Sequence, residues 1–217
     1  MPLATQRSSV LARADRHLFK VSAAAAAAAG FGIVGIAETA EAVIQYSGPV
    51  NLAVPANFTG IYLNMVNGAN STVGASSVPG WDINPWVSGG LWRLFPNSNA
   101  AGTTDDGGVV VSGTAVTNMP FGTPIGPSNT YSTSSASTLF TGPGIAGIRL
   151  LNEGTGQIHF GWARFNMVSG ATPGLIVDYA FETSPNTAIP AGAVPEPASL
   201  GLLAVGALGL MRRRARA

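Results

Sequence analysis

Histidine and cysteine are the side chains that most often carry nucleophilic or metal chemistry, and this chain of 217 residues is poor in both. It has no cysteine, which excludes disulfides, thiol catalysis and cysteine–zinc sites. His159 is the one histidine in the region beyond residue 42, and no Gly-x-Ser-x-Gly nucleophile elbow accompanies it. A catalytic triad at His159 would need a serine and an acid that only the fold can bring close. We therefore interpret His159 as a structural strand histidine.

The acidic residues suggest two further kinds of chemistry. The Asp-Asp-Gly stretch at residues 105–107 resembles the start of a calcium loop, but it lacks the alternating oxygen ligands and the distal glutamate. We predict an exposed turn there. Asp82 paired with Asp178 or Glu182 would supply the two carboxyl groups of a glycosidase, yet nothing in their spacing brings them together. The sequence thus predicts no catalytic residue, no metal site, no cofactor and no enzyme activity.

Three tryptophans and an arginine form the most suggestive cluster in the middle of the chain: Trp81, Trp86, Trp92 and Arg93. On a β-sandwich, aromatic rings stack on sugar rings, and an arginine can donate hydrogen bonds to sugar hydroxyl groups. The same rings would also serve as core, because tryptophan is highly buried on average. Both interpretations remain open from the sequence.

The region from residue 43 to residue 194 contains three arginines and six acidic residues, so it carries a net charge of about −3. The three arginines are Arg93, Arg149 and Arg164, and lysine is absent from the region. A nucleic-acid partner is excluded on this basis, because neutralising phosphates requires clusters of lysine and arginine.

Residues 43–187 have the pattern of one all-β domain. Short runs of β-branched and aromatic residues alternate with Gly, Ser, Thr, Asn and Pro, and no amphipathic helical pattern appears. We predict a single β-sandwich or jelly-roll-like domain. Residues 119–137 should be a long connection, and residues 188–193 should be a flexible linker.

The last third of this domain predicts strands at residues 145–151, 157–168 and 175–182. In the middle strand, three apolar residues share a face: Ile158, Phe160 and Trp162. In the last strand, four apolar residues share a face: Leu175, Val177, Tyr179 and Phe181. Because side chains alternate with a period of two, we expect these apolar faces to meet in the core and Asp178 and Glu182 to lie on a solvated side.

Residues 194–217 have three parts: a Pro-Glu-Pro triplet, an uncharged apolar run over residues 198–211, and a basic end over residues 212–217. As a helix, the run would span about 21 Å, against about 30 Å of bilayer hydrocarbon, so hydropathy leaves a core helix open as well as a transmembrane helix. Each arginine costs about 2.5–3.5 kcal/mol at the bilayer centre, so the basic end should stop transfer on the cytoplasmic side. The arginines of this end are Arg212, Arg213, Arg214 and Arg216.

These three parts together resemble the PEP-CTERM sorting signal of bacterial exported proteins. The resemblance implies that Pro195, Glu196 and Pro197 form the motif recognised by exosortase, a membrane-embedded protease-transpeptidase. It also implies a transmembrane helix at residues 198–211 and a precursor anchored in the inner membrane. It does not specify the bond that is cleaved.

An export signal is predicted at the other end of the chain. A basic segment over residues 1–20 precedes an alanine-rich apolar segment over residues 21–37. Ala40 and Ala42 supply the small-x-small pattern of a signal peptidase site, so we predict a signal peptide over residues 1–42, cleaved after Ala42. The partners would be signal peptidase and the general secretory translocon, because the basic segment contains no twin arginine. An uncleaved N-terminal anchor helix is the alternative.

The closing strands add a second resemblance. The segments GQIHFGWAR at residues 156–164 and DYAFE at residues 178–182 are similar to the last strands of many PEP-CTERM proteins. This similarity implies a β-sandwich without implying an activity.

Three functions are compatible with these observations. The first is an exported structural protein of the cell surface or extracellular matrix, sorted by exosortase. The second is a carbohydrate-binding module for exopolysaccharide, and the third is a secreted hydrolase.

Overall fold

The computed structural model describes residues 43–98, 106–168 and 172–195. The predicted signal peptide, the apolar run and the basic end lie outside the described residues. The described part is nearly all β, with no α-helix and one short 3-10 helix. Within these residues, no helix is long and apolar enough to cross a membrane.

The first half of the domain contains β1 (Ile44–Tyr46), β2 (Leu52–Val54), β3 (Tyr62–Leu63), β4 (Asn70–Ser71), η1 (Ala75–Ser77), β5 (Ile83–Ser88) and β6 (Leu91–Pro96). The second half contains β7 (Gly108–Ser112), β8 (Ala115–Val116), β9 (Pro124–Ile125), β10 (Tyr131–Ser132), β11 (Gly142–Asn152), β12 (Gln157–Met167), β13 (Gly174–Glu182) and β14 (Ile189–Pro190). Two of these strands, β9 and β10, lie in the segment predicted as a long connection.

The larger sheet has the order β1-β13-β12-β11-β7-β10, with β2 paired to β13 and β8 paired to β7. All its strand pairs are antiparallel. Its centre is the meander β11-β12-β13, as the sequence predicted. The β11–β12 turn is closed by Asn152, whose main-chain oxygen accepts from the Gly156 amide at 2.7 Å. Gly156 has a φ of 68°, a conformation that glycine adopts without steric cost.

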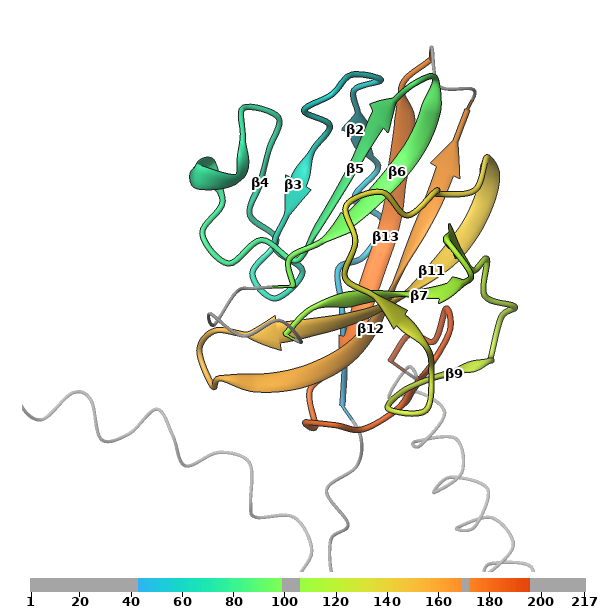
Figure 1. Ribbon diagram of the computed structural model, residues 1–217. Coiled ribbons are helices and arrows are strands. Elements are labelled where there is room, and N and C mark those ends of the chain that lie inside the picture. The colour runs from blue at the N-terminus through green and yellow to red at the C-terminus, as the bar shows by residue number, and fades with distance from the viewer. Residues whose placement is uncertain (1–42, 99–105, 169–171, 196–217) are drawn as a thin grey trace, which may run out of the picture. The chain divides into compact units, whose positions relative to one another are not determined.

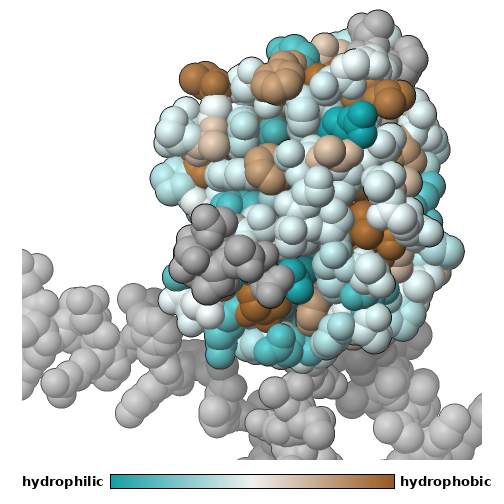
Figure 2. Space-filling view, viewed as in Figure 1, coloured by the Kyte–Doolittle hydropathy of each residue, from teal (hydrophilic) through white to brown (hydrophobic). Residues whose placement is uncertain are grey.

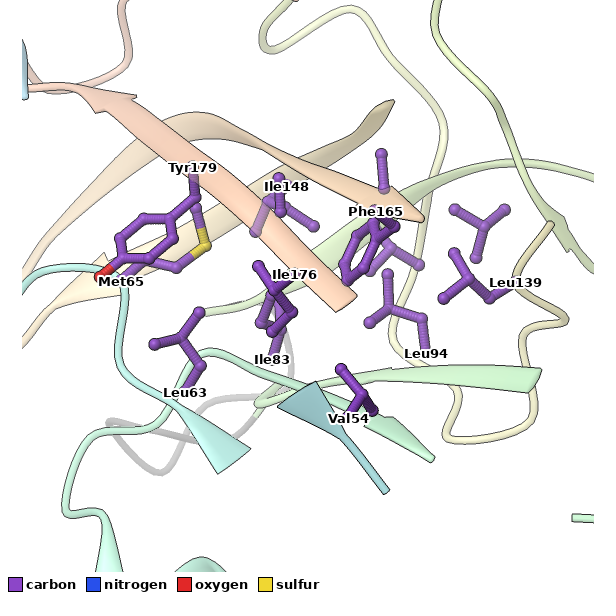
Figure 3. Close-up of a cluster of buried hydrophobic side chains, with 14 of the residues drawn as sticks. Val54, Leu63, Met65, Ile83, Leu94, Leu139, Ile148, Phe165, Ile176 and Tyr179 are labelled. Atoms are coloured by element: carbon purple, nitrogen blue, oxygen red, sulfur yellow. The ribbon is translucent and has the colours of Figure 1, made fainter. Parts of the chain in front are cut away.

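The smaller sheet, of order β4-β3-β5-β6, packs on one face of the larger sheet and makes a β-sandwich-like core (Figures 1 and 3). Each sheet contributes at least three of the largest buried side chains. The smaller sheet contributes Leu63, Ile83 and Leu94, and those of the larger sheet include Ile148, Phe165 and Ile176. Fully burying one such side chain stabilises the fold by roughly 1.5–3 kcal/mol. Apolar contact between the sheets therefore takes the place of the disulfides that this chain lacks.

A second apolar cluster covers the opposite face of the larger sheet, under the two-stranded sheet β9–β14. Ile125 of β9 and Ile189 of β14 are Cα partners and both are fully buried. Residues 188–193 therefore belong to the domain, and the predicted flexible linker was wrong. The composition of this segment suggested a linker, but its apolar positions fill a surface that the larger sheet would otherwise leave open.

The predicted faces of β13 were also partly wrong, because β13 contains a β-bulge. Arg164 is paired with Asp178, but the next residue of β12, Phe165, is paired with Ile176, so Val177 is the extra residue. A bulge shifts the alternation of side chains by one position. Ile176, rather than Val177, consequently joins Tyr179 in the core between the sheets.

The two apolar faces predicted to meet in fact point to opposite sides of the larger sheet. Phe160 and Trp162 of β12 belong to the second cluster, whereas Tyr179 and Phe181 of β13 belong to the core between the sheets. Neighbouring strands place paired residues on the same face, and Trp162 is paired with Ala180 rather than with an aromatic residue. Because both faces of the sheet are covered, no wet side remains at the centre of β13.

Candidate functional site

The candidate catalytic histidine is part of the core. His159 is 2% exposed, and its ring packs edge-on against Phe181 with 5.8 Å between the ring centroids. Its Nδ1 lies 2.7 Å from the main-chain oxygen of Glu182, so Nδ1 carries the hydrogen and donates it. Nε2 is buried without a hydrogen-bond partner among the described residues. Neither ring nitrogen is therefore bonded to a serine hydroxyl or a carboxylate, as a triad would require.

Asp178 and Glu182, predicted to be solvated, are 4% and 1% exposed. Asp178 accepts a 2.8 Å hydrogen bond from the Tyr46 hydroxyl and lies 3.2 Å from the Arg164 Nε atom. Burial, followed by the bond to Asp178, raises the pKa of Tyr46. Glu182 accepts from the Ser184 amide at 2.8 Å. These acids have structural partners, which come from the neighbouring strands β1 and β12 and from the segment after β13.

Asp82 lies toward the opposite side of the larger sheet from Asp178. Asp82 accepts from the Met65 amide at 2.6 Å, and Met65 belongs with Tyr179 to the core between the sheets. Burial, and after it the charge of Asp82, raises the pKa of Tyr179. Burial raises the pKa of Asp82 itself well above its ordinary value. The fold therefore does not bring Asp82 and Asp178 together as a pair flanking one substrate.

The Asp-Asp-Gly stretch is only partly described, since residue 105 lies outside the described part. Asp106 is 6% exposed, so the prediction of an exposed turn was wrong for this residue. The described residues contain no group of three or more histidine, cysteine or acidic side chains that could hold a metal ion.

The structure separates the predicted tryptophan cluster. Trp92 is 2% exposed in the core between the sheets, and its Nε1 donates to the main-chain oxygen of Val168 at 2.6 Å. Trp86 is half-buried on the outer face of the smaller sheet, paired across the strands with Arg93 and packed edge-on against Phe58. Strand alternation explains the difference, because adjacent residues of β6 point to opposite faces.

Trp81, also half-buried, forms a second aromatic group near the smaller sheet. Its ring lies 5.0 Å from that of Tyr62 and 5.2 Å from that of Phe95, both in edge-on geometry. Arg93 donates from Nη1 to the Ala136 main-chain oxygen and to Thr138 Oγ1. On the face drawn in Figure 2, apolar groups stand apart among polar ones.

A shallow depression of about 270 Å³ lies beside β1 and the β3–β4 loop. Its lining includes Gln45, Tyr46, Asn67 and Tyr179, and none of the predicted sugar-binding residues. No local pattern of residues predicts this depression, because its walls come from segments far apart in the chain.

The segment that leads to the predicted sorting motif is held firmly against the domain. We call residues 189–193 the C-terminal strap. Ala191 donates to the Thr123 main-chain oxygen at 2.9 Å and accepts from the Gly122 amide at 2.9 Å. Trp162 donates from Nε1 to the Ala193 main-chain oxygen at 3.0 Å. Val194 and Pro195 are exposed, so the motif begins where the strap leaves the core.

The first residues of the domain pack at the same place. The Tyr46 ring of β1 lies 6.1 Å from the Trp162 ring, and both belong to the second apolar cluster. The first and last described residues, blue and red in Figure 1, both lie at the lower end of the view. The sequence did not predict this meeting, because it depends on β1 and β12 lying on either side of β13.

Comparison with protein families identifies the segment that follows the strap. Residues 193–216 match the family model of the PEP-CTERM protein-sorting motif. Comparisons with curated proteins and with solved structures give no significant match. The chain therefore carries a C-terminal PEP-CTERM protein-sorting motif, the signal of an exported protein that exosortase processes.

Proposed function

We propose that this protein is a non-catalytic structural component of the cell surface or extracellular matrix, delivered there by exosortase. The sorting motif at residues 193–216 is the observation that carries this proposal. The described domain supports the non-catalytic part. His159, Asp82 and Asp178 are each buried and bonded to structural partners, which leaves them poorly placed to meet a substrate.

The proposed route has three steps. Signal peptidase removes residues 1–42 at the site formed by Ala40 and Ala42 after passage through the secretory translocon. The apolar run at residues 198–211 then holds the precursor in the inner membrane, with Arg212, Arg213, Arg214 and Arg216 on the cytoplasmic side. Exosortase finally acts near the triplet of Pro195, Glu196 and Pro197. The basic end supports this orientation, since four arginines would cost about 10 kcal/mol at the bilayer centre.

The proposal is tested by intact mass and terminal peptides of the protein recovered from its native host. We expect a mature N-terminus at Val43 and loss of the basic end. Replacing Glu196 with alanine should trap the unprocessed membrane form, whereas Ser199→Ala, in the same tail but outside the triplet, should be processed normally. An intact terminal Arg216-Ala217 in the wild-type protein would make the tail a plain anchor and refute exosortase processing.

A second candidate function is carbohydrate binding on the outer face of the smaller sheet. The pairing of Trp86 with Arg93 beside Phe58 favours it, because an aromatic ring and a cation lie side by side there. Trp92 does not belong to this sugar-binding candidate, because its side chain is buried. Titration of the mature protein with exopolysaccharide fragments should quench tryptophan fluorescence, and Trp86→Phe should remove that response. An unchanged response in this variant would refute binding at this face.

A further inference from the structure

We infer that Trp162 is a positioning residue for C-terminal processing. It clamps the C-terminal strap, so that the sorting motif leaves the folded domain from a fixed point and the mature protein retains residues 189–193. This inference rests on the proposed processing by exosortase. It adds the residue that positions the motif, and it places the cleaved bond after residue 193.

The strap is part of the core rather than a removable extension. Ile189 and Ala191 are fully buried in the second apolar cluster. Gly192 has a φ of 76°, and a Cβ atom at this position would lie only 2.7 Å from the Phe121 ring. Cleavage before Ala193 would remove the main-chain oxygen that Trp162 binds, and cleavage before Ala191 would also remove a buried apolar side chain. The folded domain therefore protects the bonds of the strap, whereas Val194 and Pro195 are exposed.

Trp162 is held in place by its surroundings. Its side chain is fully buried, and the Tyr46 ring and the Arg164 guanidinium lie 6.1 Å and 5.5 Å from its ring centroid. Asp178 fixes both neighbours, because it accepts from Tyr46 at 2.8 Å and pairs with Arg164 at 3.2 Å. The bond from Nε1 to the Ala193 oxygen at 3.0 Å thus comes from an indole with little freedom to turn.

The point at which the chain leaves the domain limits how far the sorting motif can reach, because the apolar run begins only a few residues after the strap. Five residues, 194–198, extend from Ala193 to the first residue of the run. Fully extended, they reach about 17 Å. Because the docked strap cannot lengthen this segment, the Pro-Glu-Pro triplet stays within about 17 Å of the domain surface when exosortase binds it.

The test uses the full chain in its native host, with Trp162→Phe as the variant. Phenylalanine keeps the buried ring but removes the Nε1 donor. The matched control is Trp86→Phe, at a tryptophan that has no bond to the strap. We expect the wild-type and control proteins to give mature C-termini at or beyond Ala193. We expect Trp162→Phe to give ragged C-termini that extend upstream into the strap.

A second readout does not depend on exosortase. In a precursor trapped by Glu196→Ala, amide exchange over residues 186–194 should be about five-fold faster with Trp162→Phe, the factor expected for the loss of one hydrogen bond. The unfolding midpoint should also fall below that of the control, because phenylalanine leaves a cavity at this fully buried site, so exchange is compared under conditions in which both variants are folded. If Trp162→Phe fails to fold, Tyr46→Phe, which removes the bond to Asp178, should raise exchange over the same residues.

Three results overturn the inference: a wild-type mature chain that ends before Ala193, exchange in Trp162→Phe equal to that of the control, or processed ends in Trp162→Phe identical to wild type. Failure of the proposed function is distinguishable, because the wild-type protein would then keep its basic end whatever the exchange shows.

Discussion

Asp82 allows the sharpest test of the physical reasoning, because its carboxyl group is buried. It is 4% exposed and accepts a 2.6 Å hydrogen bond from the Met65 amide. Burial raises the pKa of Asp82 well above its usual range, the Met65 bond opposes this shift, and the charge of Glu153 adds to it. The protein should therefore become less stable as the pH rises above the ordinary pKa of an aspartate, because the unfolded chain ionises there while the folded chain stays protonated.

The sign follows from proton binding in the two states. Below about pH 3, well under the unfolded pKa of about 3.9, the carboxyl group is protonated in both the folded and the unfolded chain, so the stability does not change with pH there. As the pH rises through the unfolded pKa, the unfolded chain releases its proton while the folded chain keeps it. The free energy of unfolding then falls by up to about 1.4 kcal/mol per pH unit, until the pH reaches the folded pKa.

The perturbation is Asp82→Asn, which keeps an oxygen for the Met65 amide and removes the titration. We expect the variant to gain stability over wild type as the pH rises above the unfolded pKa, until the folded pKa is reached, measured by urea unfolding of the mature protein at each pH. Glu153→Gln is the comparison. The pKa of Glu153 is also raised, chiefly by burial, but its side chain is largely exposed and should contribute much less. Parallel pH profiles for wild type and Asp82→Asn would refute the reasoning.

Two further predictions concern stability. Ile189→Ala should lower the free energy of unfolding by about 2–5 kcal/mol in chemical denaturation, because Ile189 is fully buried, whereas Val194→Ala, at a side chain 44% exposed, should change it by about 0.5 kcal/mol or less. A small effect at Ile189 would mean that the strap is not core. His159→Ala should lower the free energy of unfolding by about 2–4 kcal/mol, through lost packing on Phe181 and the lost bond to Glu182. Loss of a hydrolytic activity without destabilisation would instead favour the secreted hydrolase.

The sorting motif was predictable from the sequence because its parts are contiguous in the chain. The Pro-Glu-Pro triplet, the apolar run and the arginines are recognised in order along the backbone, and the family model matches the same stretch. The all-β class was predictable for a related reason. Turn residues and alternating apolar residues mark strands locally, and the β11–β12 hairpin lies where the sequence placed it.

Errors arose wherever the outcome depended on a contact between distant segments. The alternation in residues 175–182 gave no sign of a bulge, whose extra residue offers its main-chain oxygen to the amides of Val50 and Asn51. Asp178 looked solvated because its partners, Tyr46 and Arg164, belong to other strands. Trp92 and Trp86 have the same residue type, and only the packing of the two sheets decides which of them is buried.

The sequence alone determined that this is a cysteine-free, mildly acidic β domain followed by a sorting signal, because composition and linear motifs are properties of the chain itself. The tertiary structure alone decided that residues 189–193 are core and that Trp162 joins the beginning of the domain to its end. Burial and hydrogen bonding are properties of surfaces that form only when distant segments pack together, so no local pattern of residues could specify them.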